Sequence, residues 1–190
     1  MKKLLMALML GAALAHGEKV KGTGKSVDVL QFDINGIKLG MSEDEVIKIL
    51  QEKFPDRQIG EIRAKAFLEY IYGDKFSGGI IVKGKNKNDT DLVIMFSPNV
   101  LEDKPKELVV FLVSIRMPKN KENLQKLKKL AVDKFGAPVV VDSKNNYFWC
   151  DLGGKKKCDI HKPMLETRLG KKYIGFFLGN WELIYAAIRW

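Results

Sequence analysis

The sequence predicts an α+β fold of two tandem units, each an amphipathic helix packed on an antiparallel sheet in two layers. Residues 45–55 and 124–138 both carry an apolar helical face, a Lys-Phe pair and then a proline. Short β-branched and aromatic segments separated by polar turns follow each helix, which is typical of an antiparallel meander. The two stretches lie about 80 residues apart, as a tandem duplication predicts.

The chain begins with the pattern of a cleavable secretory signal. Lys2 and Lys3 precede an apolar run over residues 4–15. As a helix this run would span roughly 18 Å, too short for a membrane core of ~30 Å. Small residues then allow cleavage after Ala15 or Gly17. We therefore expect a signal peptide over residues 1–17 and a periplasmic or secreted protein without stable membrane insertion. The alternative is that this run is a strand or helix of the fold itself.

The composition indicates a globular and basic protein. The chain is 46% hydrophobic and 29% charged, with a net charge of +10. Only five of its 33 basic residues are arginines. Because arginine is the residue that forms bidentate hydrogen bonds with phosphates and bases, nucleic acid is not an expected partner. A general lysine-rich bias in composition together with solubility explains this charge, although an acidic protein, glycan or lipid head group would also be attracted. Residues 18–26 are polar and aperiodic, which predicts a flexible leader.

Cys150 and Cys158 are the two cysteines of the chain, and they flank a glycine- and lysine-rich turn. In an oxidising compartment they are expected to form a disulfide across a hairpin tip, with Trp149 packed over it. A metal site that also includes His161 is the alternative, but it lacks a convincing fourth ligand. We expect no metal site.

The first unit is expected over residues 27–118. An alternating strand at 27–34 leads to a helix that begins after Ser42 and ends before Pro55. Ser42 and Glu45 form a capping box at its start. Strands follow at 79–82, 92–96 and 108–116, with a polar turn at 84–89. Residues 56–72 fit either helix or strand, and the aromatic content of 66–72 favours a strand.

The second unit is expected over residues 119–190. Asn120 precedes a helix that ends at Gly136. Strands are expected at 139–142, 147–151, 158–160, 173–178 and 181–190. The last of them alternates, with Trp181 and Tyr185 on one face.

Residues 36–46, Gly-Ile-Lys-Leu-Gly-Met-Ser-Glu-Asp-Glu-Val, resemble a signature of the β-lactamase-inhibitor-protein-like fold. That fold is shared with the small lipoprotein subunit of the outer-membrane barrel-assembly machinery. The resemblance implies tandem helix-on-sheet modules that bind other envelope proteins. It does not extend to inhibitory contact residues, to a lipidation cysteine or to a disulfide in the first unit.

The sequence contains no pattern typical of an enzyme. His161 is the one histidine that certainly remains after signal cleavage, and it lies in a polar turn. Motifs for a serine nucleophile, a zinc-bound hydrolytic centre or a phosphate-binding glycine loop are missing from the sequence. We therefore expect no catalytic residues and no cofactor.

The residues with some binding character fall into two kinds. Two lysine-rich turns could attract an acidic partner, and three aromatic residues near the end of the chain are of types enriched at protein interfaces. The expected function is non-enzymatic binding of an envelope or secreted protein, with inhibition of a hydrolase as one version. The alternative is lysine-driven binding of anionic glycan or lipid head groups. The candidates are Lys83, Lys85, Lys87, Lys155, Lys156, Lys157, Trp181, Tyr185 and Trp190.

Overall fold

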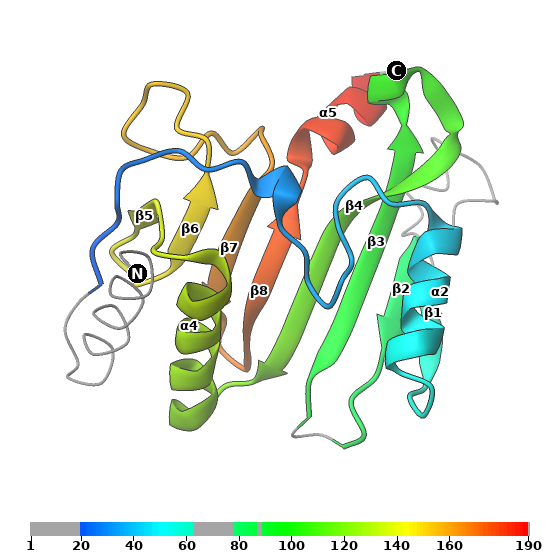
Figure 1. Cartoon of the computed structure of the whole chain (residues 1–190), viewed down its shortest axis with the longest axis horizontal. Helices are drawn as coiled ribbons and strands as arrows, with labels where there is room; N and C mark the ends of the chain where they lie inside the picture. Colours follow the sequence, from blue (N-terminus) through cyan, green and yellow to red (C-terminus); the bar gives the residue numbers. More distant parts are fainter. Residues whose placement is uncertain (1–19, 63–77, 87–88, 190) are drawn as a thin grey trace, which may run out of the picture.

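A computed structural model of the chain describes residues 20–62, 78–86 and 89–189 (Figure 1). Within these residues the strands form one eight-stranded antiparallel sheet in the order β1-β2-β3-β4-β8-β7-β6-β5. The strands are β1 (Ile59–Ile62), β2 (Gly79–Val82), β3 (Asp91–Asn99), β4 (Lys104–Pro118), β5 (Val140–Val141), β6 (Tyr147–Cys150), β7 (Met164–Leu169) and β8 (Tyr173–Gly179). The α-helices are α2 (Glu43–Lys53), α4 (Lys121–Phe135) and α5 (Trp181–Arg189), and η1 (Val29–Gln31) and η2 (Val100–Glu102) are short 3₁₀ helices.

The prediction of two tandem units, each with its own sheet, was wrong. Strand β4 pairs with β8 over seven residue pairs, from Leu112 opposite Gly179 to Pro118 opposite Tyr173. This pairing joins the strands of both halves into a single sheet. The main hydrophobic core is also continuous, since it contains Leu50 from α2 and Leu127 from α4.

Helices α2 and α4 lie on one face of this sheet, as Figure 1 shows. The predicted capping box at the start of α2 is confirmed. The Ser42 hydroxyl accepts a hydrogen bond from the Glu45 amide, and the Glu45 carboxylate accepts one from the Ser42 amide at 2.8 Å. The predicted N-cap of α4 is confirmed as well, because the Asn120 side chain accepts from the Asn123 amide at 2.7 Å.

Trp149 packs under α4 and not over the disulfide. Its side chain is fully buried, its ring lies 6.0 Å from that of Phe135, and its indole N–H donates to the Gly136 carbonyl. Successive side chains of a strand point to opposite faces, so the neighbouring Cys150 points away from α4. Cys150 belongs to a separate small cluster with Met164.

Three expected strands are not strands. Residues 181–189 form helix α5, which begins where the Asn180 side chain accepts a hydrogen bond from the Leu183 amide and buries Leu183 beside Phe111. Residues 158–160 lie in the irregular segment between β6 and β7, and β7 begins later, at Met164. Residues 27–34 contain η1, because the Asp28 side chain accepts from the Leu30 amide and favours a turn over an extended chain.

The segment expected to be a flexible leader makes backbone hydrogen bonds to the second half of the chain. The Thr23 amide donates to the Pro138 carbonyl at 2.8 Å and the Gly24 amide to the Val139 carbonyl at 3.0 Å. The predicted signal peptide and the expected strand over 66–72 lie outside the described residues. Among the helices described, none has the length and apolarity needed to span a membrane.

Candidate functional site

A groove of about 810 Å³ lies on the face of β6 and β7 opposite α4. We call residues 151–163, between β6 and β7, the disulfide loop. This loop and α5 form walls of the groove, and the β5–β6 turn lines it as well. Its volume lies within the range of about 300–1,000 Å³ that is common for binding pockets. It is lined by Val140, Val141, Asp142, Ser143, Phe148, Lys156, Lys157, Cys158, Ile160, Met164, Glu166, Arg168, Trp181 and Tyr185.

The floor of the groove follows from strand alternation. Phe148 on β6 lies opposite Glu166 on β7, and Cys150 lies opposite Met164. These side chains share the face that points away from α4, since Trp149 points toward it. The floor therefore combines the apolar side chains of Phe148 and Met164 with the charged side chains of Glu166 and Arg168.

Glu166 is paired within the protein. Its carboxylate oxygen Oε1 accepts a hydrogen bond from Arg168 Nε and forms an ion pair with Nη2 of the same guanidinium, and its side chain is largely buried. The Arg168 guanidinium also lies over the ring of Phe177, 4.5 Å from the ring centroid. This stack holds the guanidinium beside Glu166, so the two charges offset each other at this side of the groove.

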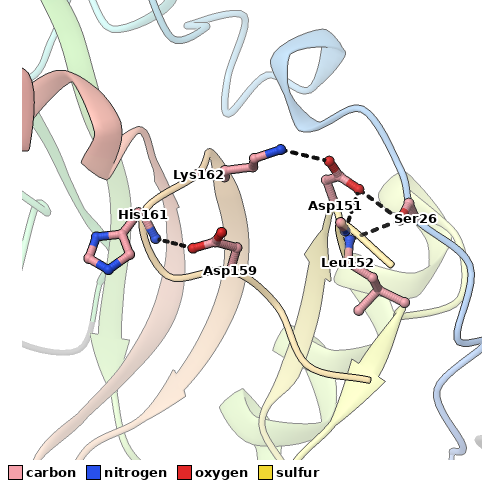
Figure 2. A network of polar contacts seen from close by, with 7 residues as sticks. Ser26, Asp151, Leu152, Asp159, His161 and Lys162 are labelled. Atoms are coloured by element: carbon pink, nitrogen blue, oxygen red, sulfur yellow. Dashed lines mark hydrogen bonds and ion pairs between the residues drawn. The ribbon is translucent and has the colours of Figure 1, made fainter. Parts of the chain in front are cut away.

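The disulfide loop is fixed by covalent and polar contacts. The predicted disulfide between Cys150 and Cys158 is confirmed, which also removes both sulfurs as thiolate metal ligands. The Asp151 carboxylate accepts hydrogen bonds from the Ser26 hydroxyl at 2.9 Å and from Lys162 at 3.2 Å. Figure 2 shows both contacts. Together with the Gly153 amide, these donors lower the pKa of Asp151 from 3.8 to about 2.

Two further contacts position the loop. The Ser26 hydroxyl accepts a hydrogen bond from the Leu152 amide at 2.9 Å, which ties the N-terminal segment to the start of the loop (Figure 2). Farther along, Asp159 accepts from the His161 amide. The His161 ring then meets Tyr185 of α5 edge-on, with 4.7 Å between ring centroids. The loop therefore contacts both the N-terminal segment and the last helix.

The charged side chains at the rim of the groove differ in whether they have partners within the protein. The Asp142 carboxylate accepts hydrogen bonds from the Lys144 amide and from both the amide and the side chain of Asn146. By contrast, Lys156 and Lys157 are exposed and have no hydrogen-bond or ion-pair partner for their ammonium groups among the described residues. The carboxylates of Asp142 and Glu166 are therefore hydrogen-bonded within the protein, whereas the ammonium groups of the two lysines are free to pair with a ligand.

Four of the candidates predicted from sequence meet at this groove, namely Lys156, Lys157, Trp181 and Tyr185. Lys155 is exposed in the same loop but does not line the groove. Lys83 and Lys85 lie between β2 and β3, in the other half of the sheet, and Lys87 and Trp190 lie outside the described residues.

The sequence prediction missed the floor of the groove. Phe148, Met164, Glu166 and Arg168 were not among the candidates, although the last three follow one another at a spacing of two. That spacing is the signal that could have placed them on one strand face. The sequence instead predicts a strand at 158–160, whereas the strand that carries these side chains is β7.

Comparison with known proteins identified no matching family model, no matching curated protein and no matching solved structure. Function is therefore inferred from the groove itself.

Proposed function

We propose that this protein is an exported, non-enzymatic binding protein that contacts a protein of the cell envelope through the groove. The observation that carries this proposal is that Trp181, Tyr185 and two lysines, unpaired among the described residues, surround a floor that includes Phe148 and Met164. Tryptophan, tyrosine and arginine side chains dominate the energetics of many protein interfaces, and lysines at a rim steer an acidic partner.

Export is supported by the disulfide and by the signal-like pattern of residues 1–17. Disulfides persist in the periplasm and outside the cell, whereas cytosolic thiols are usually kept reduced. The resemblance of residues 36–46 to envelope-protein binders favours the same compartment and the same kind of partner. Periplasmic or secreted placement is thus part of the proposal.

A matched pair of variants tests the proposal. Tyr185 lies in the groove and is 40% exposed, whereas Tyr173 lies at the start of β8 and is 56% exposed. Tyr185→Asp and Tyr173→Asp change the net charge equally at two exposed tyrosines. Each variant, and the unaltered protein, is immobilised and incubated with solubilised envelope proteins at 0.5 M salt, about three times the ~0.15 M at which charges are already screened beyond 8 Å.

The proposal predicts an envelope protein that is retained by the unaltered protein and by Tyr173→Asp but lost from Tyr185→Asp. Retention of the same proteins by both variants would exclude the groove as the contact. Retention only at low salt, together with binding to anionic lipid or glycan, would favour the lysine-driven alternative, for which Lys156 and Lys157 are the supporting observation.

A further inference from the structure

We infer that the groove accepts an acidic peptide segment in which an apolar or aromatic side chain is adjacent to carboxylates. The apolar side chain would lie on the floor formed by Phe148 and Met164, and the carboxylates would pair with Lys156 and Lys157. This inference rests on the proposed function, and it specifies the chemistry of the partner.

The charges that face the groove determine that its ligand should be negatively charged. Glu166 is offset by Arg168, and the Asp142 carboxylate is occupied by donors of its own turn. The remaining unpaired charges of the lining are the two lysine ammonium groups. An anionic ligand gains both attractions without displacing an internal partner, whereas a cationic ligand would be repelled by both lysine ammonium groups.

The apolar requirement follows from the floor and from the α5 wall. Phe148 and Met164 contribute carbon and sulfur surface from the strands, and Trp181 and Tyr185 contribute aromatic surface from the helix. Methionine and aromatic side chains adapt to flat or branched apolar groups and form favourable sulfur–aromatic and ring–ring contacts. A small, purely polar anion would leave this surface in water.

Two separate positive centres favour a peptide over a single-chain fatty acid. Lys156 and Lys157 are consecutive residues of the same exposed turn, so their ammonium groups are separate charges. One fatty-acid carboxylate can pair closely with one of them, whereas a peptide with acids on either side of an aromatic residue can pair with both. The disulfide closes the loop that carries both lysines, which limits the entropy lost when they bind.

A pair of fluorescent dyes tests the charge and apolar requirements together. 1-Anilinonaphthalene-8-sulfonate carries a sulfonate on an apolar frame, and N-phenyl-1-naphthylamine has the same frame without the charge. The sulfonate dye should bind the intact protein more tightly. Lys156→Ala with Lys157→Ala should weaken its binding by about threefold to fivefold, because the single sulfonate of the dye pairs closely with one exposed lysine at a time. Lys171→Ala with Lys172→Ala, at the exposed β7–β8 turn, is the charge-matched control and should leave the affinity unchanged.

Competition then identifies the source of the anion. The competitors are a short peptide of alternating glutamate and phenylalanine, the same peptide with glutamine in place of glutamate, and palmitate. Displacement of the dye by the glutamate peptide at a lower concentration than by palmitate or the glutamine peptide supports the inference. Displacement in the reverse order overturns it, as does equal weakening of dye binding by both lysine pairs.

The two proposals fail separately. An envelope partner that Tyr185→Asp loses, combined with no displacement by the glutamate peptide, would leave the proposed function standing and exclude the acidic-peptide chemistry. Strong displacement of the dye by the glutamate peptide, combined with retention of the same envelope proteins by both tyrosine variants, would support the acidic-peptide chemistry and exclude the groove as the contact with an envelope protein.

Discussion

Removal of the disulfide is the perturbation whose size the structure predicts most directly. Cys150 and Cys158 are separated by eight positions, so the bridge closes a loop of about nine residues. In the chain-entropy description this closure stabilises the folded protein by about 2.6 kcal/mol, through the entropy it removes from the unfolded chain. Cys150→Ala combined with Cys158→Ala should lower the free energy of unfolding by this amount.

The assay is urea denaturation followed by circular dichroism, with and without a reducing agent. In thermal denaturation of a chain of this size, the same loss of free energy corresponds to a fall in Tm of about 5–10 °C. Reduction of the unaltered protein should reproduce the effect of the double variant, and reduction of the double variant should add nothing. This comparison separates the cross-link from the small loss of packing at the buried Cys150 position.

The same variant tests how the loop serves the groove. Lys156 and Lys157 lie inside the closed loop, so opening it should weaken binding of the sulfonate dye severalfold. An unfolding free energy within about 0.5 kcal/mol of the unaltered value would refute the entropic reasoning. It would indicate that the Asp151 network alone restrains the loop.

Three further predictions concern the core, the central strand pair and the loop. Trp149→Ala should destabilise the protein by about 3–5 kcal/mol in denaturant, since the side chain is fully buried; a loss below about 1 kcal/mol would contradict this packing. Gly175→Ala places a Cβ 1.9 Å from the Ile115 carbonyl oxygen, so it should cost about 1–3 kcal/mol in the same assay, whereas Gly60→Ala on the edge strand should cost little. The pKa of Asp151 in the folded protein lies below its ordinary value of 3.8, so the stabilisation from its carboxylate should be complete above about pH 4 and lost as the pH falls through about 2. An NMR titration of the Asp151 carboxyl carbon should give a midpoint near 2. A midpoint near 3.8 would exclude the network of Figure 2.

Local signals in the sequence predicted local structure well. Ser42 and Glu45 determine where α2 begins, because a capping box satisfies two backbone amides within one turn. The disulfide follows from two cysteines in a chain with a secretory pattern. Strand β2 was predicted with its observed bounds. In each case the deciding contacts lie close together in the sequence.

The pairing of strands could not be predicted in this way. The backbone hydrogen-bonding groups along one side of a strand can be satisfied equally by many partner strands, and nothing local in residues 112–118 or 173–179 specifies that they pair. A repeated order of helix and strands therefore led to an expectation of two units, although β4 and β8 join all strands in one sheet.

The secondary structure at the end of the chain could not be predicted from its pattern of apolar residues either. Trp181, Leu183 and Tyr185 alternate, which fits a strand, but Leu183 and Ile184 pack together against the sheet, which fits a helix. The Asn180 cap decides between them by satisfying the Leu183 amide. As a helix, this segment turns Trp181 and Tyr185 toward the disulfide loop, and the groove depends on that arrangement.

Site-specific photo-crosslinking tests most directly whether the groove binds a protein partner. A benzophenone amino acid is incorporated at position 185 or, as the control, at position 173, and intact cells that produce the protein are irradiated. Replacement of Tyr185 should yield a discrete crosslinked envelope protein that is absent after replacement of Tyr173 and weaker after disulfide removal. Crosslinks of equal pattern from both positions, or none from position 185, would contradict a binding role for the groove.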